Sequence, residues 1–151
     1  MLALYDIDRQ PIKGFFGPFR FLSNFHFVDV EYEGLKYRTT EHAYQAAKSS
    51  LRAEHLAIQS LEQPREARRM GQEIKLRPTW HEEKYEIMLD LNIQKYAQEP
   101  LRTWLLQTGE SYLEETNHWG DVYWGVCNGV GENNLGDILM QIRRDLRSIG
   151  E

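Results

Sequence analysis

The residues best suited to chemistry lie at the start of one predicted helix. Thr40 is a suitable N-cap, and Glu41 would then lie in the first turn, where the helix dipole favours a carboxylate. At helical spacing Glu41, Tyr44, Gln45 and Lys48 share one face. Glu41 and Lys48 are roughly 10 Å apart along the axis, too far for a direct ion pair but suited to gripping one elongated substrate. The alternative is an ordinary solvent-exposed polar face.

The opposite face of this helix consists of small residues, Ala43, Ala46 and Ala47 among them, on which another element can pack closely. No helix breaker occurs before Pro64, so the helix is predicted to continue to about Ser60.

Arginines are concentrated in the next predicted helix, which runs from Arg65 to about Lys75. Arg68 and Arg69 lie on it, and Arg77 follows just beyond its end. Arginines on a short helix commonly form a solvated face. The alternative is a clamp for phosphate or pyrophosphate, which guanidinium groups bind in a bidentate manner.

Trp80 begins a further predicted helix, to about Gln98, in which Lys84 lies one turn beyond Trp80 on the same face. A tryptophan in this position is commonly part of the core. Its place beside a turn and near a lysine also suits a wall on which a base stacks.

A second unusual region extends from Asn117 to Gly136. It contains five glycines, two tryptophans and one aspartate, and includes Asp121, Trp124 and Asn133. This composition suits a loop whose backbone approaches a ligand closely.

Several chemistries are disfavoured. The five histidines show no HxxxH, HExxH or Cys/His spacing, so we expect no metal site. Cys127 has no evident catalytic partner and is interpreted as an inert thiol. The glycines of residues 129–136 follow a loop and do not fit a phosphate-binding or dinucleotide-binding fingerprint.

The remaining candidate site is a set of carboxylates and aromatics with nearby basic groups. These residue types suit cleavage at a sugar anomeric carbon, where a carboxylate opposes positive charge and aromatics stack on the departing base.

Composition narrows the class of protein. The chain has 151 residues, which favours one domain over residues 1–151. It has no apolar run near the length of about 18 residues that spans a membrane, and its first residues do not resemble a signal peptide, so we expect a cytoplasmic location. A formal net charge of −5 argues against a broad nucleic-acid-coating surface but permits recognition of a single nucleotide.

The predicted fold class is mainly α, a multihelical single domain with a small β-hairpin. The hairpin is expected from the alternating pattern of His26–Tyr32, followed by Glu33-Gly34 and Leu35–Arg38. Besides the helices named above, a short one is expected between Pro100 and Gly109, and a final one from about Asn134 to Ser148.

Six short segments carry a family resemblance, and they are residues 21–25, 40–48, 67–71, 76–80, 124–125 and 131–136. They occur in family order, and from about Phe15 to Leu146 the chain resembles the YbiA-like, or NADAR, domain family. The family often has Thr-Ser where this chain has Thr-Thr before Glu41, and both pairs can cap a helix.

The resemblance implies a multihelical YbiA-like fold and hydrolysis of N-glycosidic bonds. It implies two substrate classes: phosphoribosylamino-pyrimidine intermediates of riboflavin synthesis, and ADP-ribose on guanine in DNA or nucleosides. By motif position it makes Glu41 and Asp121 the acidic residues, Trp80 the stacking wall, and Lys48 or Lys84 the basic group near the anomeric carbon.

The predicted site follows from the residues and the resemblance together. The predicted catalytic residues are Glu41, Lys48 and Asp121. The predicted substrate-binding residues are Asn24, Tyr44, Arg69, Arg77, Trp80, Lys84, Trp124 and Asn133. No cofactor is expected. The partner would be a small ribosylated base or an ADP-ribosylated nucleotide, with single-stranded DNA contacted at one nucleotide.

The same residues suit two rival functions. One is a non-catalytic module that binds ADP-ribose or an NAD derivative, and the other is a structural or interaction domain. The combination of Glu41, Lys48 and Asp121 favours the enzyme, because binding an anionic ligand needs fewer acidic groups.

Overall fold

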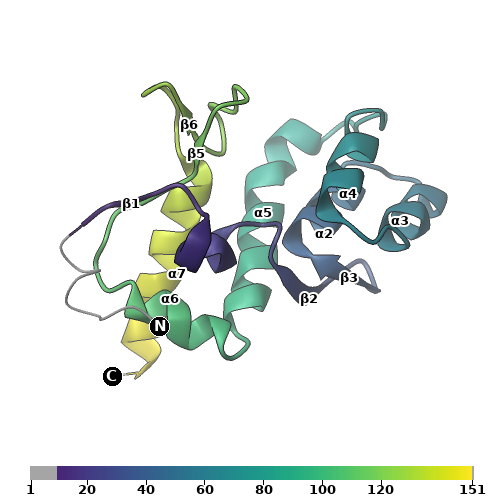
Figure 1. The fold of residues 1–151 in the computed structure, drawn as a ribbon. Coiled ribbons are helices and arrows are strands. Elements are labelled where there is room, and N and C mark those ends of the chain that lie inside the picture. Colours follow the sequence, from purple (N-terminus) through teal and green to yellow (C-terminus); the bar gives the residue numbers. More distant parts are fainter. Residues whose placement is uncertain (1–9, 151) are drawn as a thin grey trace. The chain divides into compact units, whose positions relative to one another are not determined.

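The structure is a computed structural model, and it describes residues 10–150. It is mostly helical with small two-stranded sheets, which confirms the predicted fold class (Figure 1). The described chain forms two compact units, residues 24–95 and residues 10–23 with 96–150. Residues 1–9, to which the signal-peptide prediction applies, and Glu151 lie outside the described residues. The single domain over residues 1–151 therefore stays a prediction.

The unit of residues 24–95 opens with the predicted hairpin. Strands β2 (Phe27–Tyr32) and β3 (Leu35–Thr39) pair antiparallel. Glu33 and Gly34 join them with φ angles of 46° and 82°. Positive φ at both central residues is what a two-residue hairpin turn requires, so the turn was readable from the sequence. The hairpin delivers the chain directly to the next helix.

Helix α2 (Thr40–Ala47) begins one residue earlier than the cap assignment predicted. The N-cap is Thr39, whose Oγ1 accepts the backbone N–H of His42 at 3.0 Å, so the assignment of Thr40 as N-cap was wrong. A second hydrogen bond, to the His42 ring, favours Thr39 over Thr40 as the N-cap. Because the carbonyl of Leu61 can only accept, Nε2 donates to it at 3.0 Å, and Nδ1 then accepts the hydroxyl of Thr39 at 2.7 Å.

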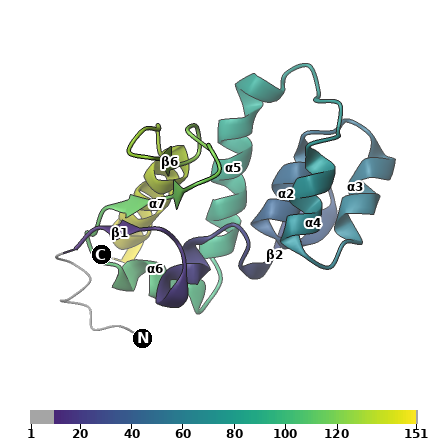
Figure 2. The ribbon, with the colours of Figure 1, turned by 45° about the horizontal axis from the view of Figure 1, so that its top comes forward.

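The small-residue face of α2 packs as predicted. Ala43, Ala46 and Ala47 have no exposed surface. Helices α3 (Arg52–Gln59) and α4 (Pro64–Gly71) lie beside α2, as both ribbon views show (Figures 1 and 2). The absence of bulky side chains allows these short helices to approach the backbone of α2.

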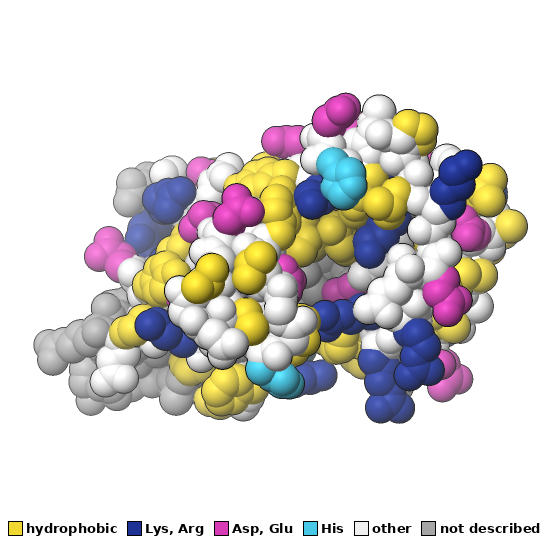
Figure 3. All heavy atoms as spheres, turned by 90° about the horizontal axis from the view of Figure 1, so that it is seen from above, with side chains coloured by type: hydrophobic (Ala, Val, Ile, Leu, Met, Phe, Trp, Pro, Cys, Tyr) yellow, Lys and Arg dark blue, Asp and Glu magenta, His cyan; other side chains and the backbone are white. Residues whose placement is uncertain are grey.

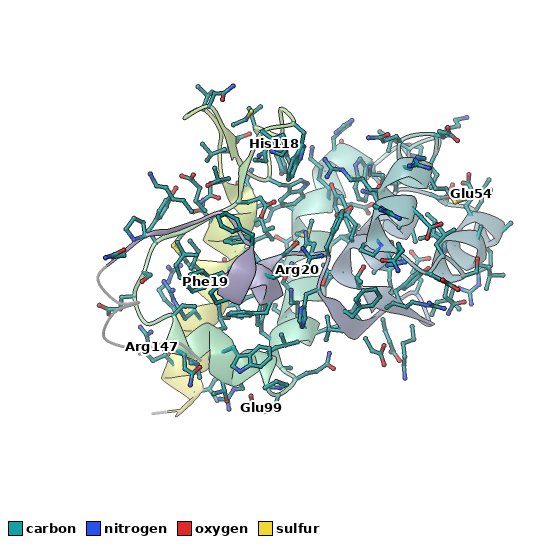
Figure 4. The ribbon with its side chains drawn as sticks, viewed as in Figure 1. Phe19, Arg20, Glu54, Glu99, His118 and Arg147 are labelled. Carbon is teal, nitrogen blue, oxygen red and sulfur yellow. The ribbon has the colours of Figure 1, made fainter. Side chains whose placement is uncertain are left out.

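The predicted single helix to Ser60 was wrong, because α2 ends at Ala47 and a separate helix, α3, begins at Arg52. Ser49 organises the break. Its Oγ accepts the backbone N–H of Leu51 at 3.0 Å and donates to Glu54, which is labelled in Figure 4. The carbonyl of Ser49 accepts Nε2 of His55 at 2.8 Å and Nη2 of Arg77 at 3.2 Å. These side-chain bonds replace the helical ones that the break removes.

The remaining helices of this unit follow the sequence more closely. Pro64 occupies the start of α4, and Gln63 with Glu66 forms a capping box there, but the helix ends at Gly71 rather than near Lys75. Helix α5 runs from Trp80 to Tyr96, two residues short of the predicted end.

The other unit contains the 3₁₀ helix η1 (Gly17–Leu22), on which Phe19 and Arg20 are labelled in Figure 4, and the helices α6 (Leu101–Gln107) and α7 (Asn134–Gly150). Two parallel strand pairs were not predicted. Strand β1 (Ile12–Lys13) pairs with β4 (Leu113–Glu114), and β5 (Thr116–Asn117) pairs with β6 (Val126–Cys127).

Helix α7 is anchored by buried side chains. Ile138, Leu139 and Ile142 are buried at helical spacing, as predicted for the final helix. The buried Arg143 donates to Oγ1 of Thr108 and to the carbonyl of Ser111, both at 2.8 Å. These bonds tie α7 to the end of α6. No helix within residues 10–150 is both long and apolar enough to cross a membrane.

Candidate active site

Glu41 is fixed at the start of α2 with only 9% of its surface exposed. Its backbone N–H donates to the carbonyl of Asn24 at 3.1 Å, so the loop before the hairpin closes one end of the helix. Its carboxylate oxygen Oε2 accepts Nε2 of Gln45 at 2.6 Å. Burial and a short hydrogen bond to an amide distinguish this carboxylate from a solvated surface group.

Lys48 lies at the C-cap of α2, half-buried, with its Nζ 5.7 Å from the centroid of the Tyr44 ring. Burial lowers the pKa of Lys48, and the positive charges of Arg68 and Lys84 lower it further, while Glu41 opposes the shift. A lowered pKa raises the fraction of neutral amine, the form that acts as a nucleophile or base.

Tyr44 and Trp80 form an aromatic pair beside these groups. Their ring centroids are 5.1 Å apart and their planes are inclined by 54°. Trp80 is only 3% exposed and Tyr44 only 7%. Trp80 therefore packs as a core residue at the start of α5, and its stacking on a base stays a prediction.

Two neighbouring arginines of α4 differ in their surroundings. Arg68 is half-buried and its charge acts on Lys48, whereas Arg69 is exposed. Lys84, half-buried on α5, acts on Lys48 as well. The basic groups whose charges lower the pKa of Lys48 are thus Arg68 and Lys84.

Arg77 is engaged by the chain itself. Its guanidinium lies 3.3 Å from the Glu33 carboxylate and 3.7 Å from that of Glu83, and it donates to the carbonyl of Ser49 at 3.2 Å. Its backbone N–H donates to the carbonyl of Lys48 at 2.8 Å. Arg77 therefore secures the segment that carries Lys48, a role that the sequence did not indicate.

Asn24 is buried, with 9% of its surface exposed, and its Nδ2 donates to the sulfur of Met88 at 3.5 Å. Its Oδ1 is a buried acceptor with no hydrogen-bond partner among the described residues. Its predicted contact with substrate stays a prediction.

The remaining predicted site residues belong to the unit of residues 10–23 and 96–150. Asp121 is partly buried, and its Oδ1 accepts the backbone N–H groups of Tyr123 at 3.1 Å and Trp124 at 2.9 Å. The ring of Trp124 meets that of Tyr123 edge-on, with centroids 4.7 Å apart. One oxygen of Asp121 thus shapes the loop.

Asn133 is 4% exposed, and its amide brackets the neighbouring chain. It donates to the carbonyl of Leu113 at 2.9 Å and to the hydroxyl of Tyr112 at 3.3 Å, and it accepts the backbone N–H of Glu115 at 2.9 Å. These bonds give Asn133 a structural role. Its predicted contact with substrate is tested by no observation.

The described residues contain no group of three or more His, Cys, Asp or Glu side chains placed to hold a metal ion. Acidic and basic side chains are interspersed over the face shown in Figure 3.

The family model described as the NADAR domain matches residues 9–147, most of the chain. This chain belongs to the NADAR domain family. The predicted family membership is thereby confirmed.

Three relatives and one solved structure show what this NADAR chain is similar to. It is 34% identical over 128 residues to N-glycosidase YbiA of Escherichia coli K12, a match that covers 82% of this chain and 79% of that protein. It is 32% identical over 139 residues to N-glycosidase Npun_R5314 of Nostoc punctiforme, covering 87% and 88%. It is 33% identical over 150 residues to riboflavin biosynthesis protein VVA0006 of Vibrio vulnificus, and this match covers 94% of the chain but spans only 40% of that longer relative.

The NMR structure of the E. coli protein YbiA matches this NADAR fold with a TM-score of 0.81 at 30% identity, covering 93% of this chain and 88% of that one. The predicted YbiA-like fold is confirmed by this match. The names of the first two relatives denote hydrolases of N-glycosyl bonds, which agrees with the predicted enzyme class.

Gln45 is a residue that sequence reasoning passed over and that the structure places against Glu41. Gln45 was placed on the polar face of α2 but given no role, although its contact with Glu41 is short and buried. The signal was present, because residues four apart on a helix are neighbours.

Proposed function

We propose that this chain is an N-glycosidase that hydrolyses the bond between a ribose and a base or amino-pyrimidine. The observation that carries the proposal is the buried face of α2, where Glu41 and the half-buried Lys48 act on each other electrostatically. Membership of a family whose members include named N-glycosidases supports it.

The chemistry asks for a negative charge near the anomeric carbon, because cleavage of an N-glycosidic bond develops positive charge there. Glu41 is proposed to oppose that charge or to orient the attacking water. A carboxylate shielded from solvent does this more strongly than an exposed one, since the local dielectric constant is lower. Asp121 is proposed as the second acidic group, which protonates the departing base, on the strength of its residue type and family position.

Lys48 has two candidate roles. It either holds the ribose by hydrogen bonds or attacks the anomeric carbon of the opened sugar. In the second role C1 of the opened sugar is an imine carbon bonded to the base nitrogen, and Nζ adds to it. A proton passes from Nζ to the base nitrogen, the bond from C1 to that nitrogen breaks, and the base leaves as its amine. This leaves an imine between C1 and Nζ, which water hydrolyses to release the sugar as an aldehyde. The lowered pKa of Lys48 supports this role, because only the neutral amine attacks.

Two substrate classes are proposed: ADP-ribose attached to guanine, and phosphoribosylamino-pyrimidines of riboflavin synthesis. Both carry phosphate near the ribose. Arg68 and Lys84 beside Lys48 could meet that phosphate. A relative named as a riboflavin biosynthesis protein supports the second class, but this chain matches only part of that protein.

The direct test is incubation of the wild-type protein with ADP-ribosylated guanosine and, separately, with a phosphoribosylamino-pyrimidine, while free base is measured by chromatography. We expect one of the two substrates to release base with multiple turnovers. Tight binding of both without release of base would contradict the enzyme and support a module that only binds ADP-ribose.

The role of Lys48 is tested in the same reaction with borohydride. If Lys48 acts covalently, the reductant traps a sugar adduct on Lys48 that mass spectrometry locates, and Lys48→Arg is inactive because arginine does not readily form an imine. If the Lys48→Arg variant is active and no adduct is trapped, covalent attack by Lys48 is excluded and Lys48 holds the ribose by hydrogen bonds.

A further inference from the structure

Gln45 and Glu41 form a buried pair within α2. They lie four residues apart, which places them on adjacent turns of the same face. Gln45 is 4% exposed and Glu41 is 9% exposed. Nε2 of Gln45 donates to Oε2 of Glu41 at 2.6 Å, short for a hydrogen bond from an amide nitrogen. The carboxylate therefore has a neighbour that restricts its orientation.

Gly71, the last residue of α4, provides the space for the Gln45 side chain. A Cβ added at Gly71 would overlap both Oε1 and Cδ of Gln45. The φ angle of Gly71 is not positive, so the backbone itself would accept alanine there. The close approach of the Gln45 amide is therefore the reason that position 71 holds a glycine.

The amide oxygen of Gln45 does not explain why this buried position holds a polar residue. Oε1 of Gln45 is buried and has no hydrogen-bond partner among the described residues. Burying such an acceptor costs stability, which an apolar side chain of the same length would avoid. The contact that justifies the amide is the one with Glu41.

We propose that Gln45, seated against Gly71, is a positioning residue that holds the Glu41 carboxylate toward the anomeric carbon. The inference rests on the proposed N-glycosidase function. An amide N–H stabilises a carboxylate and fixes the plane of its two oxygens, so the charge is already oriented when the transition state develops. Gln45 acts through Glu41 and does not need to contact the substrate.

The test begins with Gln45→Met, which keeps length and helix propensity but removes the N–H donor. We expect kcat to fall about 10- to 100-fold, as is typical when a partner that orients a reacting group is removed. KM should change by less than about twofold, because substrate binding is not the affected step. Gln72→Met, at the exposed C-cap of α4, is the matched control and should keep wild-type kcat and melting temperature.

A double-mutant cycle separates positioning from general damage to the fold. In a Glu41→Gln background the further change Gln45→Met should lower kcat by less than about twofold, because the carboxylate that Gln45 orients is already absent. A merely structural role would lower kcat by the same factor in both backgrounds and would lower the melting temperature in both.

Gly71→Ala perturbs the same contact from the other side. We expect its kcat to fall as in Gln45→Met, with KM within about twofold of wild type. In a Gln45→Ala background Oε1 and Cδ are absent and only Cβ of residue 45 lies near the added methyl group, at 3.1 Å, so adding Gly71→Ala should lower kcat and the melting temperature by much less than it does alone.

Failure of the positioning role and failure of the proposed function give different results. If wild type releases base and Gln45→Met turns over at the wild-type rate, the positioning role is overturned while the N-glycosidase stands. If wild type releases no base from either substrate, the proposed function fails and the positioning role falls with it. An additive double mutant also overturns the positioning role.

Discussion

Helix α2 and the glycine-rich segment of residues 117–136 both attracted notice through chemistry-bearing side chains, yet they use those side chains differently. In α2 the Glu41 carboxylate is bonded to a side-chain amide and interacts with the Lys48 ammonium group. In the glycine-rich segment, Asp121 and Asn133 direct their side chains largely to backbone groups. A polar side chain that hydrogen-bonds only to backbone groups stabilises the conformation of a loop. A buried polar side chain that interacts with other ionisable groups is a better candidate for a catalytic residue.

The largest effect on stability is expected at Asn133. Asn133→Ala removes the hydrogen bonds to the partly buried N–H of Glu115 and to the buried carbonyl of Leu113, and we expect a loss of about 3 kcal/mol in the free energy of unfolding. Urea denaturation measures it. KM measured well below the melting temperature should stay near the wild-type value. Unchanged stability with a large rise in KM would instead make Asn133 a substrate contact.

Asn133→Gly sharpens this result. Asn133 has a φ angle of 55°, which glycine adopts freely and alanine does not. The glycine variant should therefore be about 1 kcal/mol more stable than the alanine variant, and the rest of the loss reports the hydrogen bonds.

Asp121 combines both uses of a polar side chain, since one oxygen shapes the loop and the carboxylate has a proposed chemical role. Asp121→Asn keeps an Oδ1 that accepts the same two backbone N–H groups, so the melting temperature should hold. Loss of the acid should lower kcat about 100-fold. Full turnover in steady-state kinetics would reduce Asp121 to a loop residue.

Arg68 and Arg69 offer a comparison within one helix. Arg68→Gln should raise KM roughly tenfold, the loss expected for one charge-assisted contact with phosphate, and should affect kcat less. Arg69→Gln, at the exposed neighbouring position, should stay within about twofold of wild type. Equal KM values for wild type and both variants would remove the phosphate clamp.

The smallest effect is a pH dependence of stability at the N-cap of α2. Burial lowers the pKa of His42 from its ordinary value, although the hydrogen bond to Leu61 opposes the shift. The unfolded chain then binds more protons below about pH 6.5, so the contribution of His42 is present above that pH and is lost as the pH falls, by at most about 1.4 kcal/mol per pH unit. His42→Gln should show a shallower loss of unfolding free energy between pH 7 and pH 5. Equal slopes for the two proteins would exclude His42 as the source.

The hairpin shows what local sequence could predict. Glu33 and Gly34 between two alternating segments were enough to locate the turn, because the requirement for positive φ is a property of those two residues. The small face of α2 and the apolar stripe of α7 were equally readable, since each depends on periodicity alone.

The break after Ala47 could not be predicted in this way. No proline or glycine lies between Lys48 and Leu51, and the break is stabilised by the guanidinium and backbone of Arg77, far along the chain. The two-residue parallel strand pairs were missed for the same reason, because their pairing is long-range and their length gives no alternating pattern.

The candidate site was predictable in its residue types but not in its partners. Spacing placed Glu41, Gln45 and Lys48 on one face. It could not tell that Arg77 is held by Glu33 and Ser49, nor that Arg68 rather than Arg69 acts on Lys48. These distinctions depend on which side of a helix faces a neighbouring element.

Glu41→Gln is the most direct test of the proposal that the buried carboxylate of Glu41 drives cleavage of the N-glycosyl bond. The substitution keeps the size of the side chain and removes its charge. Turnover and thermal unfolding should be measured on the same preparation with the substrate that wild type cleaves. We predict that kcat falls by about 100- to 1,000-fold while the melting temperature stays close to wild type. Full turnover by Glu41→Gln would contradict a catalytic role for this face of α2.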